Sequence, residues 1–233
     1  MEQNMNQNME QQNVDPDRIL QKAAESVLVE EGLFQKGKSR MWIDDQGWFL
    51  VLVEFQPSGI EPGSYLNVGL SYLWSRRDYL SFDYGSRQHD FMAYEGDPEK
   101  FYQDMVFLAK EAMAKVTEFR KFGNLSFAKD VICKGRNLKD DTNECYQKMM
   151  ICGLLKDKQA EEYYHVLSNK LKNAYYKWEK AYQKELVEHI ASIIHSRDRF
   201  YEYICGKIRA QREYWHNART GMKKIEADGF FCQ

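Results

Sequence analysis

Two apolar stretches joined by a turn rich in Pro and Gly constrain the fold of this chain most strongly. The first, WFLVLVEF at 48–55, has apolar side chains at both odd and even positions. Because successive side chains of a strand point to opposite faces, this strand is predicted to be covered on both sides over part of its length. The second, YLNVGLSYLW at 65–74, alternates large apolar residues with small or polar ones, which predicts one more fully buried face. The pair predicts an antiparallel sheet.

Helix-start signals stand on both sides of this sheet region. Asp15-Pro16 and Asp97-Pro98 each place a capping side chain before a proline at the first helical position. The apolar spacing that follows predicts one helix over 16–31 and a long amphipathic helix that ends at Gly123. Shorter β-patterns predict a further strand at 40–44 and one or two edge strands from 80–84 and 90–94. We therefore expect an α+β domain over 15–123, with a small antiparallel sheet flanked by helices.

The second half of the chain, 124–233, is predicted to be an all-helical C-terminal domain. Its apolar residues recur at spacings of three and four. The predicted helices cover 125–135, 141–154, 157–169, 171–196 and 198–218. The last two carry matching stripes. The first consists of Leu171, Tyr175, Trp178, Tyr182, Leu186, Ile190 and Ile193, and the second of Phe200, Ile204, Ile208, Gln211, Trp215 and Ala218. The two helices could form an antiparallel hairpin, or one long helix that pairs with a second copy to give a homodimer.

Composition limits the classes of partner and the compartment. The first 14 residues are polar and low in complexity, so we expect a disordered tail. A net charge of −2 argues against nucleic acid as a partner, since such binding depends on several cationic contacts to phosphate. No apolar run approaches the roughly 20 residues of a membrane span, so no membrane contact is expected. Five cysteines without a CxxC pair favour a reduced, cytoplasmic environment over a disulfide framework.

Four short segments give the first half a resemblance to a known family. They are Glu-Gly-Leu-Phe (31–34), Lys-Gly-Lys (36–38), Val-Glu-Phe-Gln-Pro-Ser (53–58) and Leu-Asn-Val-Gly-Leu (66–70). Over about 17–122 the chain resembles the bacterial family known as domain of unknown function 4304. The resemblance implies an α+β fold and a bacterial origin, and it brings no catalytic residue or cofactor.

Candidate enzyme sites are incomplete in the sequence. Glu162 and His165 have the Glu-x-x-His spacing of di-iron helical bundles, and Glu185, Glu188 and His189 follow. A di-iron site needs two such pairs and two further carboxylates, and the second pattern here has a different spacing. Without a nucleophile motif such as GxSxG, no cysteine or serine is anchored beside a histidine. We therefore predict no catalytic, cofactor-binding or metal-binding residues, with a hydrolase or metalloenzyme kept as an alternative.

Nucleic-acid binding is the other alternative, because cations and aromatic rings are interleaved near the C-terminus. The cations are Arg197, Arg199, Lys207, Arg209, Arg212, Arg219, Lys223 and Lys224. The rings are Tyr201, Tyr203, Tyr214 and Trp215. Acidic residues lie among them, and the rings partly coincide with the apolar stripe, so a helix that buries its rings and exposes its charges explains the pattern better.

The predicted function is a non-enzymatic protein–protein interaction, of an immunity or adaptor type. Aromatic residues concentrate in the irregular segment that follows the second apolar strand. Aromatic loops on a rigid sheet are common binding surfaces. The candidate interaction surface consists of Trp74, Arg76, Arg77, Tyr79, Phe82, Tyr84 and Phe91.

Overall fold

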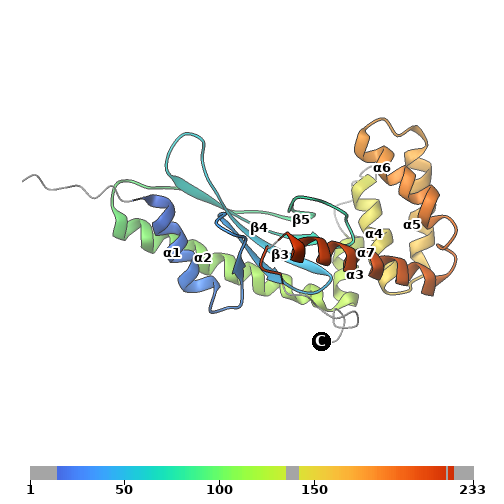
Figure 1. The fold of residues 1–233 in the computed structure, drawn as a ribbon, viewed down its shortest axis with the longest axis horizontal. Helices are drawn as coiled ribbons and strands as arrows, with labels where there is room; N and C mark the ends of the chain where they lie inside the picture. Colours follow the sequence, from blue (N-terminus) through green and yellow to red (C-terminus); the bar gives the residue numbers. More distant parts are fainter. Residues whose placement is uncertain (1–14, 135–141, 219, 223–233) are drawn as a thin grey trace, which may run out of the picture.

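The computed structural model describes residues 15–134, 142–218 and 220–222. A five-stranded antiparallel sheet is followed by a helical C-terminal region, so the predicted α+β class is confirmed. Figure 1 shows the sheet and the helices α1 and α2 at one end of an elongated molecule, with α4, α5 and α6 at the other. The strands follow one another as a meander in the order β1-β2-β3-β4-β5.

Helices α1 and α2 begin where the sequence predicts. The Asp15 side chain accepts a hydrogen bond from the Asp17 amide and caps α1 (Pro16–Leu28). The Asp97 side chain does the same for the Glu99 and Lys100 amides and caps α2 (Pro98–Arg120). Both helices have proline in the first turn, where its missing N–H costs no hydrogen bond.

The strands pair in regular antiparallel register. Their bounds are β1 (Phe34–Gln35), β2 (Met41–Asp45), β3 (Phe49–Gln56), β4 (Gly63–Tyr72) and β5 (Tyr84–Ala93). Val51 lies opposite Leu70 and Val53 opposite Val68, and all four are fully buried. Of the two alternatives predicted for 80–84 and 90–94, a single edge strand is present, but the predicted bounds were wrong. One continuous strand, β5, forms instead, because pairing with β4 runs through the polar residues between the two segments.

Opposite faces of β3 are covered by different parts of the chain. Phe49 lies against Phe122, just after α2, with ring centroids 6.3 Å apart. The neighbouring side chain, Leu50, points to the other face and is also fully buried. On that face Asp45 of β2, which pairs with Leu50, forms an ion pair with Arg212 of α7 (Arg197–Asn217). The predicted cover on both sides of this strand is therefore present (Figure 1).

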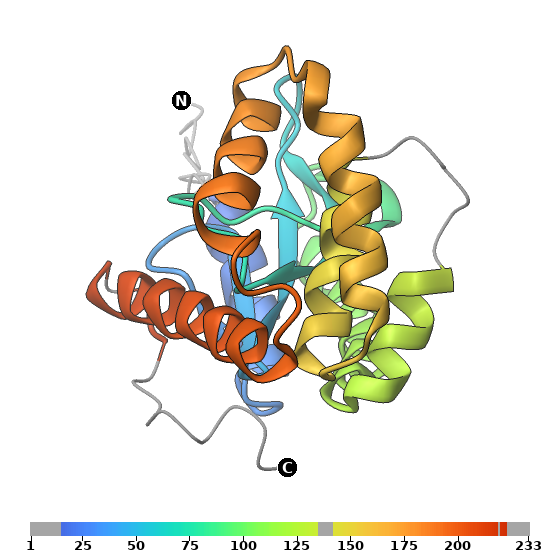
Figure 2. The ribbon, with the colours of Figure 1, turned by 90° about the vertical axis from the view of Figure 1, so that its right-hand side faces the viewer.

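The helical region contains α3 (Leu125–Lys134), α4 (Thr142–Leu154), α5 (Gln159–Lys170), α6 (Lys177–Glu185) and α7. Figure 2 shows α5 and α6 side by side, with α7 running crosswise below them. Because α7 packs against α4, the predicted hairpin of two long striped helices was wrong. One continuous helix through both stripes was also wrong, because the chain turns before Ser196 caps α7.

The predicted helix over 171–196 is broken in two places. After the short turn Leu171–Asn173, the backbone is extended at Tyr176, and the Glu179 carboxylate accepts hydrogen bonds from the Tyr175 and Tyr176 amides. A new helix, α6, therefore starts here, and Tyr175 is 79% exposed instead of lying in a buried stripe. The second break is the wider turn Leu186–Ile190 of π-helical type.

The buried apolar residues of the sheet and of the helical region belong to one connected cluster. Trp74, at the end of β4, donates its indole N–H to Gln147 of α4 at 2.5 Å. This contact lies inside the cluster, where both side chains are buried. None of the helices within the described ranges combines the length and apolar character needed to cross a membrane.

Candidate functional site

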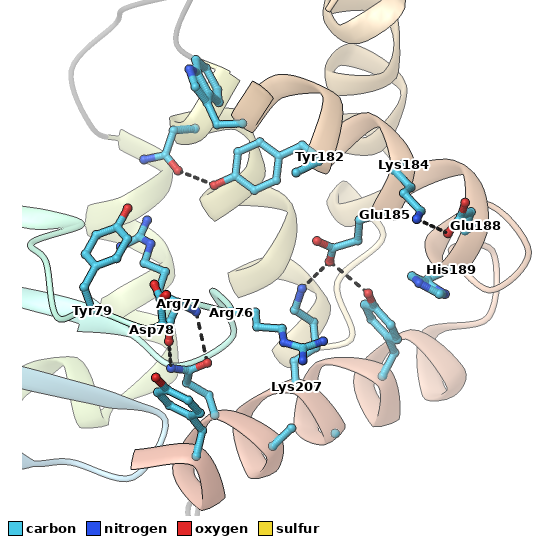
Figure 3. A pocket seen from close by; sticks show the side chains of 18 residues that line it. Arg76, Arg77, Asp78, Tyr79, Tyr182, Lys184, Glu185, Glu188, His189 and Lys207 are labelled. Carbon is cyan, nitrogen blue, oxygen red and sulfur yellow. Dashed lines mark hydrogen bonds and ion pairs between the residues drawn. The ribbon is translucent and has the colours of Figure 1, made fainter. Parts of the chain in front are cut away.

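An open cleft of about 1430 Å³ lies between the loop 75–83, helix α6 and helix α7. Figure 3 shows the loop residues Arg76, Arg77 and Tyr79 facing Tyr182 and Glu185 of α6 across the cleft, with Lys207 of α7 below. The cleft therefore combines a segment that follows β4 with two helices about 100 residues further along the chain.

The loop is held in place by a buried carboxylate. The side chain of Asp83 is fully buried, accepts a hydrogen bond from the Tyr72 amide at 2.8 Å and pairs with Arg77 at 2.8 Å. Arg77 also donates to the Ser81 hydroxyl at 2.7 Å. Burial raises the pKa of Asp83 above its usual value, although both partners oppose the rise. The contacts of the Asp83 carboxylate with the Tyr72 amide and with Arg77 therefore hold the loop 75–83 in one conformation.

Helix α7 also holds the loop in place, through hydrogen bonds between Gln211 and the backbone of Arg77. The Gln211 side-chain amide donates to the Arg77 carbonyl at 2.6 Å, and its oxygen accepts from the Arg77 amide at 3.2 Å. The Gln211 side chain thereby gives hydrogen-bond partners to both the N–H and the C=O of Arg77, which lies outside any helix or strand. Gln211 is itself buried, so the distance between loop and helix is defined by this contact.

The inner wall of the cleft is a hydrogen-bonded cluster around Glu185. One oxygen of this carboxylate accepts from the hydroxyls of Tyr146 and Tyr203, each at 2.9 Å, and also from Lys207. Lys207 in turn donates to the Tyr146 hydroxyl at 3.0 Å. Burial lowers the pKa of Lys207, while Glu185 acts in the opposite direction. Burial also raises the pKa of Tyr146 well above its usual value, so its hydroxyl keeps its proton and can donate.

Aromatic rings form the outer surface of the cleft. Tyr79 is 60% exposed, Trp178 is 48% exposed and Tyr214 is 44% exposed. Deeper in, the ring of Tyr182 stacks on Tyr146 with centroids 4.4 Å apart. The exposed rings come from the loop, α6 and α7, so a ligand in the cleft would touch aromatic surface on three sides.

Arg76 supplies a cation at the edge of the cleft. It is exposed, and among the residues that the structure describes it has no ion-pair partner. Arg77, by contrast, is paired with Asp83, and Lys184 lies 3.8 Å from Glu188. Arg76 is therefore free to meet a carboxylate of a ligand.

The structure separates the predicted surface residues into two groups. Arg76, Arg77 and Tyr79 line the cleft. Trp74 is fully buried, with its ring stacked on Trp48 at 5.0 Å, so it cannot meet a partner on this surface. The remaining three rings pack on the sheet away from the cleft: Phe82 over Gly69, Tyr84 beside Phe119 and Phe91 beside Tyr65.

The residues of the predicted metal pattern have other partners. Glu185 pairs with Lys207, Glu188 with Lys184, and His189 lies over the ring of Tyr203. His165 lies 3.8 Å from Glu161, whose carboxylate also accepts a hydrogen bond from Nδ1 of His195 at 2.7 Å. Within 15–134, 142–218 and 220–222, no group of three or more His, Cys, Asp or Glu side chains is placed to hold a metal ion.

The sequence interpretation missed the α6 and α7 residues of the cleft. Trp178, Tyr182 and Tyr203 were assigned to apolar stripes or a basic face, and Glu185 to a metal pattern. No sequence signal marked the start of α6. Glu179 accepts a hydrogen bond from the Tyr176 amide, but tyrosine lacks the short hydroxyl side chain that Ser or Thr supplies in a capping box, and its side chain makes no capping hydrogen bond. Trp178 was therefore placed in the apolar stripe.

Comparison of the chain with protein-family models, with curated proteins and with solved structures gave no match. The resemblance of the first half to domain of unknown function 4304 therefore stays a prediction.

Proposed function

We propose that this protein recognises a partner protein through the cleft between the loop 75–83, α6 and α7. The occupant would be a peptide segment that places an apolar or aromatic side chain among Tyr79, Trp178 and Tyr214 and a carboxylate against Arg76. The observation that carries the proposal is the gathering of these exposed rings around a cation without an ion-pair partner in the described structure.

The physical argument rests on residue type and rigidity. Trp, Tyr and Arg are the residues that most often dominate binding energy at protein interfaces. Tyr and Trp also offer large contact areas while losing little conformational freedom. Here the walls are already ordered by the Asp83 and Gln211 contacts and by the Glu185 cluster, so a ligand would not have to order them.

A photo-crosslinking experiment in the native cells tests this proposal. The reactive amino acid p-benzoylphenylalanine replaces Tyr79 in the cleft or, as a matched control, Ile60, which is 96% exposed in the turn between β3 and β4. We expect the position 79 probe to give an adduct with one partner protein and the position 60 probe to give none. Adding Trp178→Ala to the position 79 probe should lower the adduct by about tenfold, the size of a modest hot spot.

Three outcomes would contradict the proposal. The first is an equal set of adducts from positions 79 and 60, which would mean non-specific contact. The second is an adduct unaffected by Trp178→Ala. The third is an adduct between two copies of this chain, which would replace the partner by the homodimer considered from the sequence. The proposal includes the predicted bacterial cytoplasm as its setting, and recovery of the protein in another cell fraction would contradict that part.

Two of the basic C-terminal residues already pair with carboxylates of this protein, which disfavours nucleic-acid binding. Lys207 is committed to Glu185, and Arg212 is buried in a two-point contact with Asp45. Trp215 is also buried, so it offers no face for base stacking. Arg219, Lys223 and Lys224 lie outside the described residues. We therefore keep protein recognition as the proposed function.

A further inference from the structure

Two cysteine thiols meet where α3 packs against α4, away from the cleft. The sulfur of Cys133 on α3 lies 3.9 Å from the sulfur of Cys152 on α4, and both are free thiols. Cys133 is half-buried, so small solutes can reach it, whereas Cys152 is fully buried behind it. A cysteine that is accessible and backed by a second thiol has the arrangement of a reactive and a resolving residue.

The surroundings of the pair favour a negative charge on Cys133. When Cys133 is a thiolate, the Cys152 thiol donates a hydrogen bond to it, and the side chains of Tyr163, Lys129 and Lys148 stabilise the same charge. Together they lower the pKa of Cys133 to about 7 against the opposing effect of burial. Lys129 is held at this place by its ion pair with Asp157 at 2.5 Å. A substantial fraction of Cys133 is therefore thiolate, the reactive form, at neutral pH.

The other thiols in the described part of the chain do not share this environment. The hydrogen bond to Cys133, together with burial, raises the pKa of Cys152, which keeps it as the thiol donor. Cys145, whose sulfur lies 3.5 Å from the Tyr163 carbonyl, has its pKa raised by burial to about 11. Burial also raises the pKa of Cys205 on α7. Among the four cysteines that the structure describes, only Cys133 has a lowered pKa.

We propose that Cys133 and Cys152 form a reversible redox site that reacts with hydrogen peroxide and closes a disulfide between α3 and α4. In the first step the Cys133 thiolate attacks one peroxide oxygen; the S–O bond forms, the O–O bond breaks, and hydroxide leaves. Sulfur is oxidised to the sulfenic acid, and the peroxide is reduced. The pair thus senses peroxide in a reducing compartment, where thiols otherwise persist.

In the second step the buried Cys152 thiol reacts with the oxidised Cys133. The Cys152 sulfur attacks the Cys133 sulfur; the S–S bond forms, the S–O bond breaks, and the departing hydroxide takes the Cys152 proton to become water. Oxidation of Cys133 has by then removed the thiolate charge that raised the pKa of Cys152, so the attacking thiol ionises more readily. The overall change is two thiols and one peroxide to one disulfide and two waters.

The test uses the reduced full-length chain and hydrogen peroxide. After the reaction is stopped by alkylation of the remaining thiols, peptide mapping by mass spectrometry should find the Cys133–Cys152 crosslink, and dithiothreitol should remove it. Thermal unfolding of the oxidised protein should move to higher temperature, because the bond tethers two helices that pack together. Both readouts work on the unmodified sequence and do not depend on a variant that folds.

Variants then distinguish the role of Cys133, which reacts with peroxide, from that of Cys152, which closes the disulfide. Cys152→Ala should leave Cys133 as a sulfenic acid that dimedone traps, and Cys133→Ser should abolish the reaction. Cys205→Ser is the matched control and should form the crosslink as the wild type does. The proposal is overturned if the wild type gives no Cys133–Cys152 crosslink, if peroxide pairs Cys145 instead, or if Cys133→Ser reacts as fast as the wild type.

Discussion

The carboxylate of Asp83 shows how one side chain can order an irregular loop. It is fully buried between the Tyr72 amide and the Arg77 guanidinium, which hold the segment after β4 against the sheet. Burial nevertheless outweighs these partners and raises its pKa above the usual value of 3.8. The charged form of this residue is therefore less favourable in the folded protein than in the unfolded chain.

A pH series on Asp83→Asn tests this balance. Between the unfolded and the folded pKa the native state binds more protons than the unfolded state, so wild-type stability falls as pH rises through that window. The asparagine variant loses this titration. We expect the free energy of unfolding of Asp83→Asn, relative to the wild type, to increase from about pH 4 to about pH 7 in urea titrations.

The control for this series is Asp78→Asn, an exposed change of the same charge in the same loop. Its effect is subtracted at each pH. A relative stability of Asp83→Asn that decreases toward neutral pH would mean that Arg77 lowers the pKa of Asp83 below its usual value, opposite to our assignment.

At the scale of elements, the crossing of α4 and α7 depends on a glycine. A Cβ at Gly153 of α4 would lie 2.4 Å from Ile204 and 2.5 Å from Phe200, both fully buried on α7. The two helices therefore approach closely at this position. The same contact orients α7, whose far end reaches the sheet and whose middle lines the cleft.

We expect Gly153→Ala to destabilise the protein by about 1–3 kcal/mol, the usual cost of extra volume in a packed core. Gly206→Ala on α7 is the matched control, because a Cβ there meets no atom within 4 Å. It should stabilise the fold by about 0.5–1 kcal/mol through the lower entropy of the unfolded chain. Urea unfolding measures both. Equal effects of the two substitutions would show that the helices do not cross as closely as described.

At the scale of the whole molecule, Arg212 joins α7 to the turn between β2 and β3. Its guanidinium donates to both oxygens of Asp45, at 2.7 and 2.6 Å, and to the Gly47 carbonyl at 2.7 Å. The side chain is only 5% exposed. This contact spans more than 160 residues of sequence and connects the sheet with the helical region.

Arg212→Ala should therefore cost about 3–5 kcal/mol, because Asp45 is left as a largely buried carboxylate without its partner. Arg209→Ala is the control on the same helix. Its pair with Glu202 is exposed and 3.7 Å long, so about 0–1 kcal/mol is expected. Chemical denaturation followed by circular dichroism gives both values. A loss below 1 kcal/mol for Arg212→Ala would contradict the structural role of this contact.

Local sequence signals determined much of the first half of the fold. The capping residues Asp15 and Asp97, each followed by proline, predicted the starts of α1 and α2, and the alternation in 48–55 and 65–74 predicted the paired strands β3 and β4. These features depend on hydrogen bonds and side-chain directions within a few residues, so they can be read from spacing alone. Arg76 and Tyr79, two residues of the predicted interaction surface, line the cleft, and their role in binding stays a prediction.

Only the tertiary structure decided the rest of the cleft and the thiol pair. Tyr79 and Tyr214 line one cleft because Gln211 and Arg212 attach α7 to the loop and the sheet, through contacts that join residues more than 130 positions apart. Cys133 and Cys152 meet because α3 packs on α4. Such contacts arise from the packing of whole elements, whose amphipathic patterns are equally compatible with several partners. The sequence by itself determined the starts of α1 and α2 and the pairing of β3 with β4, and packing decided how the second half divides into helices and which side chains meet.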